Sequence, residues 1–303
     1  MKKAFLIRLD KIGDLVCTLP VDEHPSLQGW DVLWVIQKGI GFVAEASKPK
    51  RKYVELDKSN PASSSKDLRR LLQEYQPELA VSFQSPWWVN FALWRERVPI
   101  RAGVLSQWHS YLFLNKGLRQ KRSLAEKHES EYNYELMSYA LDSTSDAAPV
   151  LKLQAPEEAL PFLPESYVIV HPGMAGSARN IPQFRYLELI RSLAKTENVV
   201  ITGTDSDLPF LNEIKNQALS LPRVFWLVGK LSPVQLLSAL NKAKHIYSPS
   251  TGIAHLAASL DRPVTAWYSP IRVQSSRRWG PRGAKVQIIE PQVICPEAFR
   301  CSK

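Results

Sequence analysis

The stretch YVIVHPG at residues 167–173 opens the most regular part of the chain, and the segments after it decide the fold. It is typical of a buried strand that runs into a turn. A helical pattern follows over residues 183–194, with apolar residues on one face, and the next strand at 198–202 ends at Gly203. Short apolar runs that alternate with amphipathic helices predict a parallel sheet covered on both faces.

Both halves of the chain repeat this alternation. The sequence therefore predicts an α/β protein of two Rossmann-like, doubly wound domains that face one another across a cleft, residues 1–150 and 151–303. The stretch from Ser143 to Pro164, rich in Pro, Ala, Ser and Glu, is the expected linker. Further strands are predicted at 4–9, 31–36, 79–83, 224–228, 245–247 and 264–268, the last as the final core strand, and further helices at 66–75, 208–218, 234–242 and 251–260.

Composition excludes several classes of protein. An apolar share of 45% over 303 residues is that of a globular protein, and the apolar runs are too short to span a membrane. The N-terminus starts like a signal peptide, but charged residues interrupt it from Arg8 onward, so it is predicted to be a buried strand. Cys17, Cys295 and Cys301 form no paired or zinc-type spacing, which indicates reduced thiols in a cytoplasmic protein.

The net charge of +10 favours polyanionic partners: nucleic acid, phosphorylated lipid or nucleotide phosphates. No helix-turn-helix, zinc-finger or RNP-type signature is present, so nucleic acid is not the expected partner. A basic nucleic-acid-binding protein remains the alternative from another class, and salt-sensitive binding to arbitrary DNA would favour it.

Ligands of open α/β sheets bind outside the carboxyl ends of the strands, so these ends are the candidate sites. Asp14 follows the first strand and Gly13. One interpretation is a helix N-cap, and the other is a carboxylate that takes a proton from an acceptor hydroxyl.

Three strand ends in the second half are candidate donor sites. Residues 171–182 form a small-residue loop able to cradle phosphate, although it is neither G-x-G-x-x-G nor a P-loop. Residues 202–207 form a weaker glycine-acidic turn that a simple capping role would also explain. Residues 248–255 open a helix with a small polar turn, the strongest local signal. The candidate donor-binding residues are Gly173, Ser177, Arg179, Gly203, Asp207, Ser250, Thr251, Gly252 and His255.

In their order and spacing, these segments resemble those of glycosyltransferase family 9, the bacterial heptosyltransferases of lipopolysaccharide core synthesis. The resemblance covers nearly the whole chain. It is carried by Arg8-x5-Gly13-Asp14 with Thr18-Leu19-Pro20, by His171-Pro172-Gly173 with Arg179-Asn180-x-Pro182, by Thr202-Gly203, by Thr251-Gly252-x-x-His255-Leu256-Ala257 and by Arg278-Trp279-Gly280-Pro281.

The resemblance implies the GT-B architecture and an inverting transfer by direct displacement, with Asp14 as the general base. It implies no cofactor and no required metal. The donor, usually an ADP-heptose, is expected on the C-terminal domain, with Arg179 at its diphosphate and Thr251, Gly252 and His255 at the phosphate and sugar. A nucleotide-sugar epimerase of the same architecture is a more distant alternative, because it needs further acid–base residues.

The sequence departs from the family at Ser250, where typical members carry Asp. A serine cannot hold a donor hydroxyl as a carboxylate does, so the donor sugar stays open, and a family member that binds sugar nucleotide without turnover stays an alternative. The segment after Trp279 is short, which predicts a reduced last helix.

Aromatic and basic residues interleave between Pro86 and Arg122, where Glu96 is the only acidic residue. Core aromatics with a solvated basic face would explain this stretch. The alternative is a surface for a phosphorylated, lipid-linked glycan at the inner face of the membrane, where basic residues and tryptophans favour an anionic interface. The candidate acceptor-binding residues are Arg95, Arg101, Arg119, Lys121 and Arg122. The protein is then expected to be a monomer, cytoplasmic and peripheral at the inner membrane.

Overall fold

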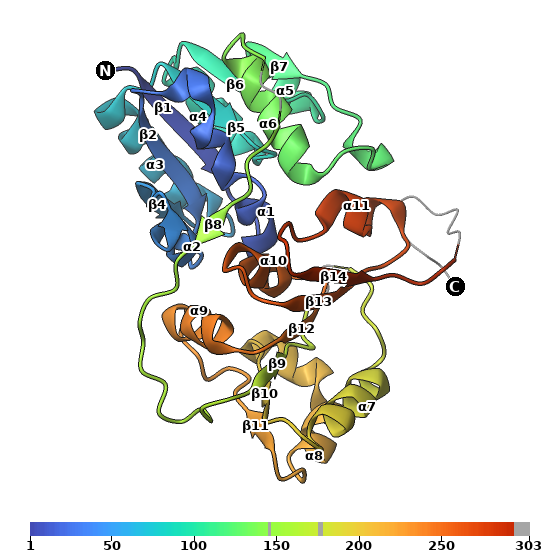
Figure 1. The fold of residues 1–303 in the computed structure, drawn as a ribbon. Helices are drawn as coiled ribbons and strands as arrows, with labels where there is room; N and C mark the ends of the chain where they lie inside the picture. The colour runs from blue at the N-terminus through green and yellow to red at the C-terminus, as the bar shows by residue number, and fades with distance from the viewer. Residues whose placement is uncertain (145–146, 175–177, 294–303) are drawn as a thin grey trace. The chain divides into compact units, whose positions relative to one another are not determined.

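The computed structural model describes residues 1–144, 147–174 and 178–293. The chain divides into two units (Figure 1). The first comprises Met1–Arg122 and Lys127–Leu151, and the second comprises Ser123–Glu126 and Lys152–Lys303. Within the described residues, no helix is long and apolar enough to cross a bilayer.

The first unit is built on a six-stranded sheet in the order β4-β2-β1-β5-β6-β7, whose neighbouring strands all run parallel. Its strands are β1 (Lys3–Arg8), β2 (Asp31–Gln37), β4 (Tyr53–Leu56), β5 (Leu79–Ser82), β6 (Ile100–Val104) and β7 (Lys116–Leu118).

β1 lies at the centre of this sheet because its residues are apolar on both faces. Ala4, Phe5, Leu6 and Ile7 are fully buried, as expected of a parallel strand covered by helices on each side. The helices of the unit are α1 (Ile12–Val16), α2 (Gly41–Glu45), α3 (Pro61–Tyr75), α4 (Trp87–Arg95), α5 (Trp108–Phe113) and α6 (Glu129–Ala140).

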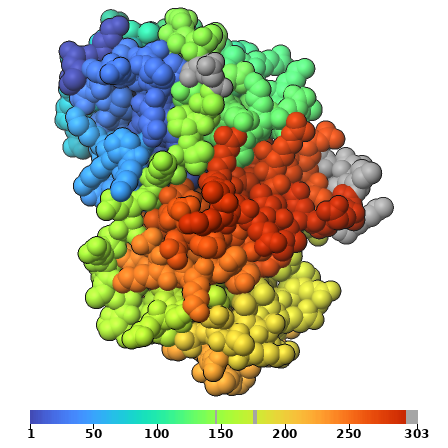
Figure 2. Space-filling model, in the orientation of Figure 1, coloured from blue at the N-terminus to red at the C-terminus, as the bar shows by residue number. Residues whose placement is uncertain are grey.

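The second unit repeats the plan with the order β11-β10-β9-β12-β13-β14, again all parallel. Its strands are β9 (Val168–Val170), β10 (Val199–Ile201), β11 (Val224–Trp226), β12 (Ile246–Pro249), β13 (Val264–Trp267) and β14 (Val286–Ile289). Its helices are α7 (Gln183–Leu193), α8 (Asn212–Ala218), α9 (Pro233–Lys242), α10 (Gly252–Ser259) and α11 (Ser276–Trp279). Residues of α9 to β14, orange to red in Figure 2, form one continuous area on the face drawn there.

Short elements complete the two units. The 3-10 helices are η1 (Leu19–Glu23), η2 (Pro25–Leu27), η3 (Arg122–Leu124), η4 (Asp205–Phe210) and η5 (Arg272–Gln274), and the two-residue strands are β3 (Ser47–Lys48) and β8 (Lys152–Leu153).

Both sheets start at a central strand, grow to one edge and then cross back to grow to the other. The crossing lies between β1 and β5 in the first sheet and between β9 and β12 in the second. Such a topological switch point is where doubly wound sheets bind ligands. The α/β prediction with two doubly wound sheets is confirmed.

Two details of the prediction were wrong. The strand at 264–268 is not the last of the core, because β14 pairs beside it. The helix expected over 208–218 is divided into η4 and α8, because Pro209 within the segment has no N–H to continue a helical ladder.

Candidate active site

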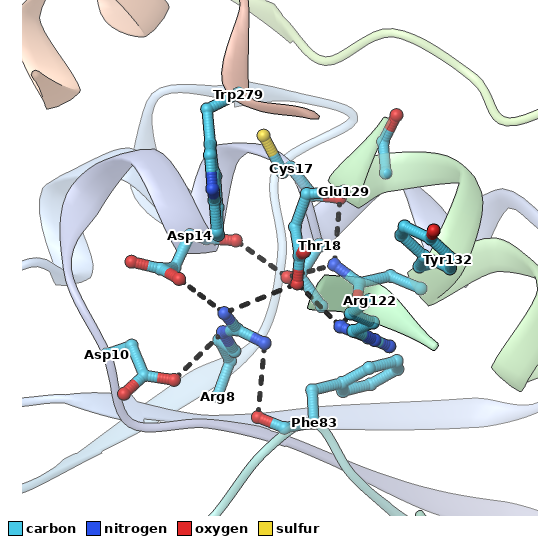
Figure 3. Close-up of polar contacts among 12 residues, drawn as sticks. Arg8, Asp10, Asp14, Cys17, Thr18, Phe83, Arg122, Glu129, Tyr132 and Trp279 are labelled. Atoms are coloured by element: carbon cyan, nitrogen blue, oxygen red, sulfur yellow. Dashed lines mark hydrogen bonds and ion pairs between the residues drawn. The ribbon is translucent and has the colours of Figure 1, made fainter. Parts of the chain in front are cut away.

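A buried arginine closes the carboxyl end of β1. The side chain of Arg8 is fully buried. An arginine is almost never fully buried unless its charge is paired. Its Nη1 donates to the carbonyl oxygen of Phe83 at the end of the neighbouring strand β5, at 3.2 Å. The guanidinium thus ties together the two strands that flank the switch point (Figure 3).

Three carboxylates surround the Arg8 guanidinium (Figure 3). Nη2 donates to Oδ1 of Asp14 and lies 3.8 Å from Oε1 of Glu129. Nε lies 3.1 Å from Oδ2 of Asp10 but lacks the alignment of a hydrogen bond. Burial by itself lowers the pKa of Arg8, but Asp14, Asp10 and Glu129 more than offset this and raise it. The cation is therefore permanent, and it holds the carboxylates in place.

A second arginine shares Glu129 from the opposite side. Nη1 of Arg122 lies 2.5 Å from Oε1 of Glu129 and 3.0 Å from Oδ1 of Asn133. The side chains of Glu129 and Asn133 are fully buried. Gln120 accepts two further hydrogen bonds from Arg122, whose guanidinium lies over the ring of Tyr132. Arg122 is thus a buried, paired cation and not part of an exposed surface, and its predicted contact with the acceptor stays a prediction.

Asp14 lies in the first turn of α1, not at its N-cap, which is Lys11. The capping interpretation of this aspartate was therefore wrong. Its side chain is 22% exposed, and among the described residues only Oδ1 has a polar partner. The backbone is fixed by Thr18, whose hydroxyl donates to the Asp14 carbonyl at 2.6 Å and accepts from Asn133 at 2.9 Å. The carboxylate is oriented through one oxygen and presents the other.

Strained backbone follows Phe83 at the same edge of the sheet. Gln84 is exposed and adopts a φ of 57°, in the left-handed region that a non-glycine residue seldom occupies. Such strain concentrates at functional sites. The sequence had no glycine or asparagine at this position to signal the conformation, so Gln84 was missed as a candidate.

The turn after β12 forms the corresponding edge of the second unit. Thr251 is the N-cap of α10 but makes no capping hydrogen bond, because its hydroxyl pairs with Oγ of Ser248 at 2.9 Å. Within the part of the chain that the structure describes, the Thr251 side chain therefore caps none of the first amides of α10, which lie at the positive end of the helix. Ser250, Thr251 and Gly252 are half-buried there, and His255 is buried one turn along the same helix.

The loop after β9 lies across the switch point from this turn, since β9 and β12 are neighbours. A Cβ at Gly173 would stand 2.3 Å from Cγ of Asp207, so only glycine allows this close approach. Asp207 is buried and accepts hydrogen bonds from the amide and the hydroxyl of Thr204, at 2.9 and 2.8 Å. Gly173 and Asp207, both predicted to bind the sugar donor, thus shape the backbone of the loop. Gly203 is packed closely on Val228.

A cavity of about 220 Å³ opens beside Gly173 and Asp207. Its apolar wall includes Met174, Tyr186 and Phe210. Asn180 at its rim donates to the Pro172 carbonyl and accepts from the Tyr186 hydroxyl, at 2.8 and 2.7 Å. These wall residues were not predicted from sequence because they come from helices as well as loops.

The remaining candidates fall in different surroundings. Arg179 is exposed just before α7, and its amide donates to Gln274 at 3.2 Å. Ser177 lies outside the described residues. Arg101 is half-buried and donates to the carbonyls of Phe113 and Val98, at 2.8 and 2.7 Å. Burial lowers its pKa. Arg95, Arg119 and Lys121 are exposed.

Two doubly wound sheets of this kind agree with the GT-B architecture. A sequence profile of glycosyltransferase family 9 (heptosyltransferase) matches residues 66–300, which is more than half of the chain. The chain belongs to this family.

Individual relatives agree with this assignment. A provisionally named glycosyltransferase of Haemophilus influenzae is 27% identical over all of this chain and 92% of its own length. Among solved structures, the ADP-heptose lipopolysaccharide heptosyltransferase II of Escherichia coli has a TM-score of 0.75 at 18% identity and covers 95% of this chain and 90% of its own. The Escherichia coli heptosyltransferase WaaC with ADP has a TM-score of 0.73 at 19% identity, covering 95% and 93%.

We predict that Glu129→Gln lowers the free energy of unfolding by about 3–5 kcal/mol, because two buried guanidinium groups lose the carboxylate between them. The measurement is urea denaturation followed by circular dichroism. Glu135→Gln, an exposed change on the same helix, is the control and should cost less than about 0.5 kcal/mol. Equal urea midpoints for the two variants would contradict the role of Glu129 as the shared partner of Arg8 and Arg122.

A second prediction concerns pH. Burial lowers the pKa of His171 to about 4, with Asp207 opposing this shift only in part, against an ordinary value of 6.5. The stability that depends on neutral His171 is complete above pH 6.5 and is lost as the pH falls toward 4. Between pH 7 and pH 5 the wild type should therefore lose free energy of unfolding on the order of 2 kcal/mol through His171, and His171→Asn should not show this loss.

This pH dependence is measured by urea denaturation at several pH values. His171 itself is followed by NMR. A His171 resonance that titrates near 6.5 would disprove the prediction, because the folded and unfolded states would then bind protons alike.

Proposed function

We propose that this family 9 glycosyltransferase performs an inverting transfer in which Asp14 is the general base. The observation that carries the proposal is the Asp14 carboxylate, anchored by buried Arg8 at the switch point of the first sheet with its second oxygen unbound among the described residues. A base needs this combination of fixed position and open access.

In the proposed step, Asp14 accepts the proton of the acceptor hydroxyl while the oxygen attacks the anomeric carbon of the donor. The bond from that carbon to the diphosphate oxygen breaks, and its electron pair leaves with the nucleoside diphosphate. One bond forms and one breaks at the same carbon from opposite sides, so the anomeric configuration inverts. Negative charge builds up on the leaving phosphate, and the proposal assigns no metal to it.

The second unit is proposed to bind the donor. The uncapped N-terminus of α10, at Thr251 and Gly252, offers amides and a positive helix end to the diphosphate. Arg179 is placed ahead of α7 for a bidentate contact with the same group. The loop from His171 to Gly173 and the Asp207 turn border the nucleotide, and His255 supports the phosphate or the sugar.

ADP-heptose is the proposed donor, because the heptosyltransferases of similar fold are described with ADP or ADP-heptose. Ser250 in place of the family's Asp favours a donor with a different hydroxyl pattern as the second candidate. The proposed acceptor is a lipopolysaccharide core or a related phosphorylated, lipid-linked glycan, bound at the cytoplasmic face of the inner membrane by a monomer. Exposed Arg95, Arg119 and Lys121 are its proposed contacts.

Asp14→Asn is predicted to lower kcat by about 10²–10⁴-fold, because the amide cannot accept the proton. Binding of ADP should stay unchanged, since the donor site lies in the other unit. The assay measures release of ADP from ADP-heptose with lipopolysaccharide of truncated core as the acceptor. Asp57→Asn, at a half-buried position just after β4, is the control and should keep full activity. A fully active Asp14→Asn enzyme would remove Asp14 from the role of base.

Binding of the donor is tested separately by thermal shift with ADP, UDP and GDP. A ligand present at about 100 times its dissociation constant stabilises the folded protein by about 2.7 kcal/mol. We expect stabilisation by ADP that Arg179→Ala weakens and the exposed α7 variant Arg185→Ala preserves. If only UDP or GDP stabilised the protein, the donor would be a sugar conjugate of that nucleotide and not ADP-heptose. Stabilisation by DNA and by none of the nucleotides would favour a nucleic-acid-binding protein instead.

A further inference from the structure

A group of aromatic side chains lies exposed on α4 and α5 of the first unit. Trp87, Trp94 and Trp108 are 52%, 47% and 64% exposed. They surround Phe91 and Phe113, with ring centroids 5.5 Å apart between the two phenylalanines and 5.6 Å between Trp94 and Phe113. These five rings form one contiguous group, named here the aromatic surface.

The aromatic surface rests on a fixed polar support. Asn90 of α4 and His109 of α5 share a hydrogen bond of 3.0 Å, and both side chains are buried. The His109 ring lies 5.7 Å from that of Trp108, centroid to centroid. Asn90 also accepts a hydrogen bond from Ser82 at 2.8 Å, and His109 is hydrogen-bonded to Gln107 at 2.8 Å. Burial lowers the pKa of His109. The two helices are thus locked together and hold the exposed rings in a set arrangement.

Exposed apolar groups of this kind mark a surface that binds a partner. Tryptophan is the residue most favoured at the boundary between lipid and water, where its ring is buried and its N–H stays hydrated. Leu112 lies one turn after Trp108 on the same short helix and is 65% exposed, so it extends the apolar group.

The charges of the same segment favour an anionic partner. Between Pro86 and Arg122 the exposed charged side chains are all basic: Arg95, Arg97, Arg119 and Lys121. The one acidic residue, Glu96, is half-buried and is held by Arg69 at 2.5 Å and Gln73 at 2.9 Å. Exposed cations in the same stretch of the chain as exposed tryptophans match a bilayer with anionic lipids.

We propose that the aromatic surface inserts into the interface of an anionic lipid bilayer and is the main attachment of the protein to its membrane. This inference rests on the proposed function, in which the acceptor is linked to lipid. Insertion of rings, more than charge, holds the protein there, because Arg101 and Arg122 are occupied inside the fold. The exposed cations select the anionic surface.

The test is co-sedimentation of the full chain with sucrose-loaded vesicles. The vesicles contain phosphatidylcholine alone or with about 30% phosphatidylglycerol. We expect binding to the mixed vesicles, and we expect the double variant Trp94→Ala/Trp108→Ala to lower the partition coefficient at least about tenfold. The control Phe184→Ala removes a ring that is equally exposed in the second unit and should bind like the wild type.

Salt separates insertion from attraction by charge. Raising the salt to about 0.5 M should abolish the contribution of Arg119 and Lys121 and leave most of the wild-type binding. Quenching of tryptophan fluorescence by brominated lipid should accompany binding and should be lost in the double variant.

Wild-type binding that disappears entirely at high salt, or a double variant that binds like the wild type, would overturn the proposal. A double variant that converts a dimer into a monomer in light scattering would also overturn it and would assign the surface to self-association. Stabilisation by ADP is measured on every variant. If ADP stabilises the wild-type protein but the wild type does not bind the mixed vesicles, the membrane inference is wrong and the proposed transferase stands.

Discussion

The ion pairs of Arg8 are the constraint on which the rest of the first unit depends. A guanidinium buried at the end of a central strand is tolerated only when carboxylates and carbonyls surround it. Asp14 and Asp10 come from the segment just after the strand, Phe83 from the neighbouring strand and Glu129 from α6, more than a hundred residues away. One cation therefore fixes the geometry of α1, β5 and α6 and, with them, the position of the proposed base.

In the proposed mechanism, the two units use the same strand order for opposite electrostatic tasks. At the first switch point a cation anchors a carboxylate, as a proton acceptor requires. At the second, an uncapped helix N-terminus and the exposed Arg179 offer positive charge. This division suits a displacement reaction, in which a proton leaves the acceptor and negative charge collects on the leaving phosphate. The shared topology thus explains why the candidate residues in both halves follow strand ends.

Strands buried on both faces were predictable from sequence, and exposed or uniformly apolar elements were not. β1 and β9 are runs of apolar residues that only a covered parallel strand explains. β14 was missed because it lies at the edge of the sheet with most of its side chains exposed, so its sequence lacks a long apolar run. α4 was missed for the opposite reason: apolar residues occupy nearly all its faces, and no helical period remains.

The candidate site shows the same limit at the level of single residues. Asp14 and the turn at Thr251 could be proposed from the sequence because their signals are local: a strand end, a small residue and a helix start. The burial of Arg122 was not predicted because sequence does not distinguish an arginine that faces solvent from one that meets a buried carboxylate. Only the fold brings Glu129 between Arg8 and Arg122. Loss of the Glu129 carboxylate would therefore leave two buried guanidinium groups without the partner they share, one at the end of β1 and one in η3.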